Sequence, residues 1–166
     1  MSMLKFTRKK PTYKTDTLAP FLKGFSIEVM PRTAAKIADF RAVLPTGTRV
    51  YIAHIDGTPI EEMLTTAKRL VSEGFKVMPH FPARIIKDRA TLENWIARYT
   101  DLGVNQALVL AGGVDIPHGE YSDSMQLWAQ VFSTNTASNV CTSRVIPKTT
   151  KTLIRMVATA RSWTLF

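Results

Sequence analysis

The sequence predicts an α/β fold in which four strand–helix units follow one another over residues 25–127. Four short apolar runs, at residues 25–30, 49–53, 75–79 and 106–110, have the length of strands. The segments between them are long enough for helices and place apolar residues on one helical face. Because strands that alternate with helices are typical of a parallel sheet, we expect the four runs to pair side by side.

Three helices are expected between these strands, each recognised by its apolar spacing and by the residue that ends it. The first carries Ile37, Phe40 and Leu44 on its apolar face and is ended by Pro45 and Gly47. The third is ended by Gly103. Its apolar face has five members: Leu92, Trp95, Ile96, Tyr99 and Leu102.

The second helix has the clearest signals at both ends. Thr58 is expected as the N-cap, Pro59 as the first helical residue and Glu61 as the partner in a capping box. Gly74 is placed to end the helix. The apolar face between these ends consists of Met63, Leu64, Ala67, Leu70 and Val71.

Two architectures use such repeats, the open doubly wound sheet and the closed eight-stranded barrel. A dinucleotide-binding sheet needs a glycine-rich turn after its first strand, but this strand ends in SIEVMPRT and no G-x-G-x-x-G occurs. In a barrel, functional groups stand at the carboxyl ends of strands, where Glu28, His54 and His80 fall. The sequence therefore predicts the first four units of an incomplete (β/α)8 TIM barrel, followed by an irregular or partly helical C-terminal tail.

Charge is distributed unevenly along the chain. The formal net charge is +9, yet all 13 acidic residues precede residue 128. The charged residues in the remainder of the chain are all basic. We expect a basic N-terminal tail at residues 1–24, a partial barrel domain at 25–127 and a separate tail at 128–166. The basic residues of that last segment are not interleaved with stacking aromatics, so nucleic acid is not an expected partner.

A cytoplasmic protein is expected from the remaining features of the composition. The basic N-terminus is not followed by an apolar segment of the kind that signal peptides carry. No run approaches the ~18 apolar residues of a membrane span, so no membrane partner is expected. The single cysteine, Cys141, has no partner for an internal disulfide.

Glu28 is the first candidate for chemistry, because it lies inside an apolar strand between Ile27 and Val29. Strand alternation directs its side chain to the opposite face from its neighbours, either into the barrel lumen or into the helix layer. Both places are expected to be largely desolvated, which raises a carboxyl pKa and allows the protonated group to act as a general acid. A structural glutamate paired with Lys or Arg near the barrel end is an equally good interpretation.

His80 is the second candidate, and it is expected in a turn after the third strand. Pro79 and Pro82 would stiffen this turn and place the imidazole and the Arg84 guanidinium at the barrel mouth. The alternative for His80, and equally for His54, is a half-buried structural histidine. Since the three histidines are scattered and none forms a ligand pair at helical spacing, no metal site is expected.

The turn after the fourth strand consists of Leu110, Ala111, Gly112 and Gly113. Paired glycines let the backbone approach a planar or phosphate-bearing ligand closely, so this turn is a candidate cofactor contact. Gly-Gly also marks ordinary tight turns.

Four segments together resemble the methylenetetrahydrofolate reductase family, in the order that the family has them: SIEVMPRT, RVYIAHIDGTP, GFKVMPHFPARII and ALVLAGGVDIPHGEYSDSMQL. The resemblance covers residues 25–127 and implies a barrel enzyme of one-carbon metabolism that binds FAD noncovalently. Such an enzyme takes hydride from NADH or NADPH and reduces 5,10-methylenetetrahydrofolate, its folate substrate, to the 5-methyl compound. The resemblance also implies that a full-length relative is a homo-oligomer.

The resemblance implies roles for individual residues. Glu28 matches the glutamate proposed as the general acid that assists opening of the folate ring, and His80 matches a histidine near the flavin. Ala53 and His54 fall where strand-two residues approach the cofactor. The turn at residues 111–113 departs from the family, because many members have Arg-Gly-Asp where this chain has Ala-Gly-Gly. This departure indicates a divergent branch.

Residues 128–166 fit the family only in another reading frame. When the third base of each codon is read with the first two of the next, residues 146–148 permit the His-Pro-Glu turn that the family has on strand five. The same offset permits GTGLFDKHGFKRLHVAG from residue 128 and HPEDNKDIDPDGGDRAVMDAL after it. We interpret the tail as the product of a frame slip and the chain as an inactive fragment whose open strand edges favour pairing. The alternative is an authentic basic extension.

Two other functions are compatible with the sequence. One is a pterin- or folate-dependent methyl-transfer protein built on the same barrel. The other is a nucleic-acid-binding module driven by the basic tail, for which binding would depend steeply on salt.

Overall fold

The computed structural model describes residue 20, residues 22–133 and four short strands beyond them; side chains are described up to residue 130. Most of the expected basic N-terminal tail, and much of the expected tail at residues 128–166, therefore lie outside the described residues.

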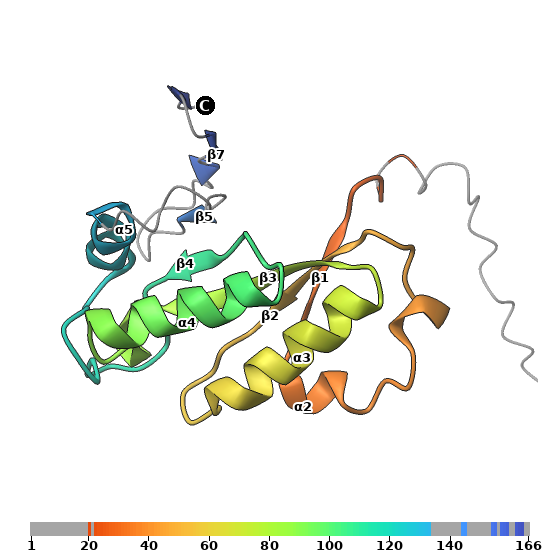
Figure 1. Cartoon of the computed structure of the whole chain (residues 1–166), viewed down its shortest axis with the longest axis horizontal. Helices are drawn as coiled ribbons and strands as arrows, with labels where there is room; N and C mark the ends of the chain where they lie inside the picture. The colour runs from red at the N-terminus through yellow and green to blue at the C-terminus, as the bar shows by residue number, and fades with distance from the viewer. Residues whose placement is uncertain are drawn as a thin grey trace, which may run out of the picture.

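Four parallel strands form one sheet, which confirms the α/β fold (Figure 1). They are β1 (Ser26–Val29), β2 (Arg49–Ile52), β3 (Lys76–Pro82) and β4 (Leu108–Leu110). Their order across the sheet is the same as their order in the sequence. Each strand is followed by helical structure that returns the chain to the same end, as parallel pairing requires.

The third strand is longer than the sequence indicated. We expected a strand that ended at Pro79 and a turn that held His80, but β3 continues to Pro82 and His80 lies inside it. The reason is a change of partner along the strand: Pro79 is the last residue paired with β2, and His80 is the first paired with β4, opposite Leu108. Pairing with β4 keeps residues 80–82 extended, where the local sequence indicated a turn.

Two long helices cover one face of the sheet, α3 (Ile60–Ser72) and α4 (Arg89–Asp101). Each is followed by the expected glycine in a left-handed conformation, Gly74 with φ of 88° and Gly103 with φ of 77°. The expected N-terminus of α3 is wrong by one residue. Pro59 itself is the N-cap, and no side chain caps the helix there. The N-terminus of α4 is capped by Asp88, which accepts a hydrogen bond of 2.8 Å from the backbone of Thr91.

The helix expected after β1 is not continuous. It is reduced to a single turn, α2 (Pro31–Ala34), followed by a 3-10 turn, η1 (Phe40–Ala42). The Arg69 side chain of α3 donates to the carbonyl oxygens of Ala34, Ile37 and Ala38 at 2.6 to 3.0 Å. These bonds satisfy carbonyl groups that a continuous helix would have used internally. A tertiary contact therefore replaces the expected helix.

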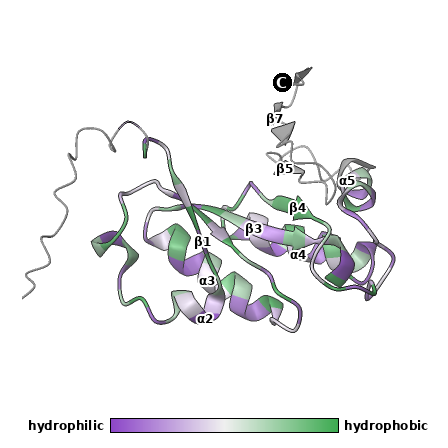
Figure 2. Ribbon diagram, turned by 180° about the vertical axis from the view of Figure 1, so that it is seen from behind, coloured by the Kyte–Doolittle hydropathy of each residue, from purple (hydrophilic) through white to green (hydrophobic). Residues whose placement is uncertain are grey.

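The main hydrophobic core lies between the sheet and its helices. It takes Val29 from β1, Val50 and Ile52 from β2, and Leu70 from α3. Figure 2 shows the corresponding pattern, with apolar residues on one side of each helix and polar residues on the other. The second face of the sheet carries a smaller cluster of Tyr51, Met78 and Leu108, to which none of the described helices contributes a residue.

A further helix, α5 (Ser124–Ser133), crosses the boundary that we expected after residue 127. Leu127 is fully buried in the main core, and Asp123 caps the helix by accepting from the backbone of Met125 and Gln126 at 2.8 and 2.9 Å. The helical start of the tail agrees with the expected partly helical structure.

Beyond α5 the tail differs from the expectation, because its described residues form short strands. Strand β5 (Arg144–Val145) pairs antiparallel with β6 (Ile154–Arg155), and β7 (Val157–Thr159) pairs with β8 (Ser162–Thr164). Their β-branched and aromatic residues favour extended backbone over helix, which explains the difference.

Candidate functional site

Glu28 and His80 meet on the second face of the sheet, near the carboxyl ends of the strands. Parallel register places Glu28 of β1 opposite Tyr51 of β2, which in turn lies opposite Met78 of β3. His80 is two residues beyond Met78 and therefore shares its face. The Oε2 atom of Glu28 lies 3.3 Å from the Nε2 atom of His80. Two residues that are 52 positions apart in the sequence thus form one acid–base contact.

The side chain of Glu28 is exposed, and the expected desolvation of its carboxyl group is wrong. Its exposed fraction is 58%, compared with 11% for the side chain of His80. The physical reason is its position on β1, which is paired on one side only, with β2. The carboxyl group is therefore accessible from solvent, while its partner is held inside the sheet.

His80 is a buried histidine with an unsatisfied ring nitrogen. Its Nε2 atom is within ion-pair distance of Glu28, but the orientation does not make a hydrogen bond. Burial lowers the pKa of His80, the Glu28 carboxylate opposes this effect, and His54 reinforces it. The imidazole is therefore mainly uncharged near neutral pH. A buried polar atom without a hydrogen bond is costly, so this nitrogen is available to a ligand or to a moving proton.

Tyr51 completes the second-face arrangement, and the sequence analysis did not select it. Its ring lies edge-on to the His80 ring, with the centroids 6.1 Å apart. Tyr51 is only 8% exposed, and it covers the side of the imidazole toward β2. The strand alternation that selected Glu28 could have found it, because a tyrosine in a buried strand carries a polar end.

His54 lies against the helix layer, as in the structural interpretation. Its ring centroid is 4.9 Å from that of Trp95 in α4, and its Nε2 atom donates to the carbonyl oxygen of Thr58 at 3.0 Å. Burial lowers the pKa of His54, so the ring is mainly neutral. Ala53, beside it, is buried, and its backbone N–H donates to Val29 at 2.8 Å. The structure therefore separates the His54 ring from the Glu28–His80 contact.

The turn after β4 brings small residues to the same strand ends. Leu110 packs beside the second-face cluster, and the carbonyl oxygen of Ala111 accepts from the backbone of Arg84 at 3.0 Å. Gly112 has a φ of 94°, and a Cβ atom at this position would lie 3.1 Å from the Cβ atom of Pro82. A Cβ atom on Gly113 would meet nothing within 4 Å. A side chain is therefore disfavoured at residue 112, whereas the surroundings of residue 113 leave space for one.

We predict that Gly112→Ala destabilises the chain by about 1 to 3 kcal/mol, because alanine strains a left-handed conformation and crowds Pro82. Gly113→Ala is the matched control, and we expect its free energy of unfolding to change by less than about 0.5 kcal/mol. Urea unfolding followed by tryptophan fluorescence measures both. Equal stabilities of the two variants would contradict a specific requirement for glycine at residue 112.

Arg84 holds the loop between β4 and α5. Its guanidinium donates to the carbonyl oxygens of Ser122 and Val114 at 2.8 and 3.0 Å. Loop carbonyl groups therefore occupy two donors of the guanidinium that we expected at the barrel mouth. The same loop carries His118, whose Nδ1 atom lies 3.6 Å from Oδ1 of Asp56 in the loop after β2. This contact joins two of the loops that surround the strand ends.

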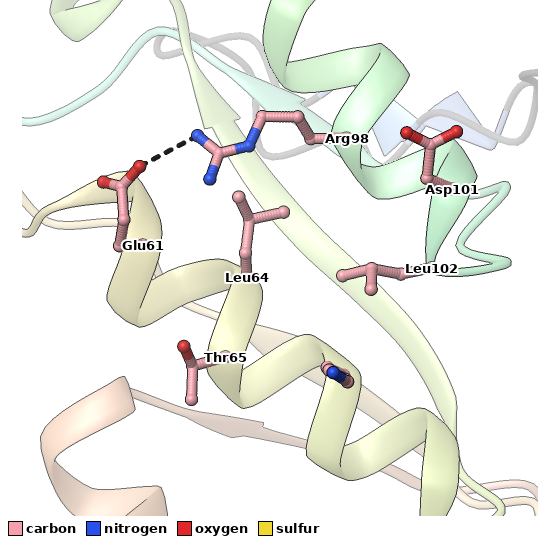
Figure 3. Close-up of a pocket in the computed structure, with 7 residues that line it drawn as sticks. Glu61, Leu64, Thr65, Arg98, Asp101 and Leu102 are labelled. Carbon is pink, nitrogen blue, oxygen red and sulfur yellow. Dashed lines mark hydrogen bonds and ion pairs between the residues drawn. The ribbon is translucent and has the colours of Figure 1, made fainter.

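A separate groove of about 320 Å³ lies between α3 and α4 (Figure 3). Leu64 and Leu102 line it, and an ion pair of 2.9 Å joins Glu61 to Arg98 across it. The groove is open and holds none of the strand-end residues. We therefore place the candidate site on the second face of the sheet and not in this groove.

Within the described residues, no group of three or more His, Cys, Asp or Glu side chains is arranged to hold a metal ion. In the same part of the chain, no helix has the length and apolar character needed to cross a membrane. No protein-family model matches the sequence.

Proposed function

We propose that residues 25–127 are the first half of an FAD-dependent (β/α)8 barrel that reduces 5,10-methylenetetrahydrofolate to the 5-methyl compound, with NADH or NADPH as donor. The observation that carries the proposal is the Glu28–His80 contact of 3.3 Å on one face of a parallel sheet. In a closed barrel of this topology, that face becomes the lumen and its strand ends become the active site.

Glu28 is the proposed general acid. Its exposed carboxyl group can reach a bound substrate, and it can regain a proton from water after donating one. His80 approaches it from the more buried side and limits the directions in which the carboxyl group can turn. When bound, the flavin supplies hydride transfer, which no side chain can perform.

The residues at the strand ends fit one edge of a planar cofactor. The strand ends carry small residues without bulky side chains: Ala53, Ala111, Gly112 and Gly113. The open space at Gly113 favours close approach of the cofactor to the backbone. The unsatisfied Nε2 atom of His80 supplies a polar group beside them. Leu110 offers an apolar contact on the same face.

Four strands cannot close a barrel, because closure pairs the first strand with the last of eight. Only half of the proposed cofactor site is therefore present in the described sheet. We expect the 166-residue chain to bind little FAD and to lack reductase activity. Its unpaired strand edges favour association between chains.

The deciding experiment restores the proposed frame by adding one base after codon 127 and compares the two purified products. We expect the restored protein to copurify with FAD and to oxidise NADH or NADPH, and the original chain to do neither. A yellow, stoichiometric flavin complex with reductase activity in the original chain would refute the fragment interpretation. A restored protein that binds folate without flavin would favour the methyl-transfer alternative.

The frame slip itself is tested at the level of the gene. Sequencing codons 126–129 in independent isolates should reveal the lost base. A clean and reproducible frame at these codons would make the basic tail authentic, and salt-dependent nucleic-acid binding by the chain would then be the function to measure.

A further inference from the structure

Glu28 and His80 are in contact, but their side chains differ in exposure to solvent. The carboxyl group is 58% exposed, whereas the imidazole is 11% exposed and has a buried Nε2 atom with no hydrogen bond. At 3.3 Å, these atoms are close enough for a proton to pass between them after a small rotation of either side chain. The exposed member can exchange with solvent, while the buried member cannot do so freely.

We propose that Glu28 and His80 form a single proton-sharing pair, in which the buried imidazole positions the exposed carboxyl group and stabilises the proton that it delivers. His80 is then a positioning residue of the acid and not only a neighbour of the cofactor. The catalytic use of the pair depends on the proposed function. The existence of the pair depends only on the geometry of β1 and β3.

The proton balance of the pair is simple. With one added proton, the pair is either a carboxylic acid beside a neutral imidazole or a carboxylate beside an imidazolium. Transfer of the proton from Glu28 to a substrate nitrogen leaves a carboxylate beside a neutral imidazole. Water then returns a proton through the exposed carboxyl group, so no other co-reactant is needed.

The groups around His80 favour coupling to Glu28 over any other described residue. Tyr51 of β2 lies edge-on to the imidazole, and Glu28 approaches it from β1. The charge of His54, whose ring packs against Trp95, lowers the pKa of His80 without a contact. Leu108 and Leu110 of β4 cannot titrate. Glu28 is the only carboxylate among the described residues that affects His80, and its negative charge raises the pKa of the imidazole against the effect of burial. Its removal should therefore lower that pKa further.

The test is an NMR titration of the histidine rings in the full 166-residue chain, with His80→Asn used to assign the His80 signal. In Glu28→Gln, we expect the His80 midpoint to fall beyond the error of the fit, while the His54 midpoint stays unchanged. Glu62→Gln removes an exposed carboxylate of α3 and is the matched control, for which neither midpoint should change.

An unchanged His80 midpoint in Glu28→Gln would overturn the proposal, as would equal shifts at His80 and His54, because equal shifts indicate a general structural change. The unshifted His54 ring, packed on Trp95, also reports that the variant is folded. This outcome is distinguishable from failure of the proposed function, because the titration needs neither flavin nor folate. A frame-restored protein without flavin would overturn the function and leave the pair intact.

Discussion

Under the proposed function, Glu28→Gln in the frame-restored protein is expected to reduce the rate of 5,10-methylenetetrahydrofolate reduction by about 10²- to 10⁴-fold, the range that general acid catalysis contributes. Glutamine keeps the size of the side chain but cannot donate a carboxylic proton. Reduction of the flavin by the nicotinamide donor does not require this acid, so its rate should change little. The two half-reactions can be followed separately by the flavin absorbance after rapid mixing.

Glu62→Gln is the control for this prediction, since Glu62 is an exposed carboxylate on α3 and is not among the charged groups that act on His80. Both half-reactions should proceed normally in that variant. If Glu28→Gln slowed flavin reduction as much as folate reduction, the glutamate would act in cofactor binding or folding, and its assignment as the acid would be wrong.

Arg69→Met is expected to lower the free energy of unfolding of the chain by about 3 kcal/mol. The Arg69 side chain donates to three carbonyl groups of the broken helix and pairs with Glu73 at 2.7 Å. It also lies over the ring of Phe40, 5.2 Å from the centroid. Methionine would leave these carbonyls and the partly buried Glu73 without their partner.

Arg41→Met provides the comparison, because Arg41 is an exposed arginine on the same segment and pairs with Asp39 at 2.9 Å. Exposed pairs contribute little to stability, so this variant should unfold at nearly the urea concentration of the unchanged protein. Equal destabilisation by the two substitutions would show that Arg69 contributes no more than an exposed arginine, and that its carbonyl contacts are not a specific source of stability.

Much of the fold could be predicted because it depends on local signals. The apolar runs became the four strands, and Gly74 and Gly103 ended α3 and α4 as expected. Glu28 and His80 could be selected for the same reason, since each has a polar side chain near the end of an apolar run. Their contact could not be predicted, because β1 and β3 are not paired directly. Their relative position depends on the register of β1 with β2 and on that of β2 with β3.

The errors occurred where a distant residue changed the local preference. The segment after β1 has the apolar spacing of a helix, but hydrogen bonds from Arg69 stabilise its broken form. His80 is flanked by prolines that indicate a turn, but pairing with Leu108 extends the strand. Arg84 could be selected from the sequence, but the carbonyl groups that its guanidinium contacts belong to a loop 30 and more residues away and could not be identified.

Local sequence patterns were sufficient to predict that this chain alternates strands with helices and that candidate acid–base groups fall near the strand ends. Periodicity and helix-ending glycines act within a few residues, so they can be recognised without coordinates. The exposure of Glu28, the burial of His80 and the contact between the two side chains became visible only in the folded chain. Burial and contact depend on which strand lies at the edge of the sheet, and that is a property of the assembled strands.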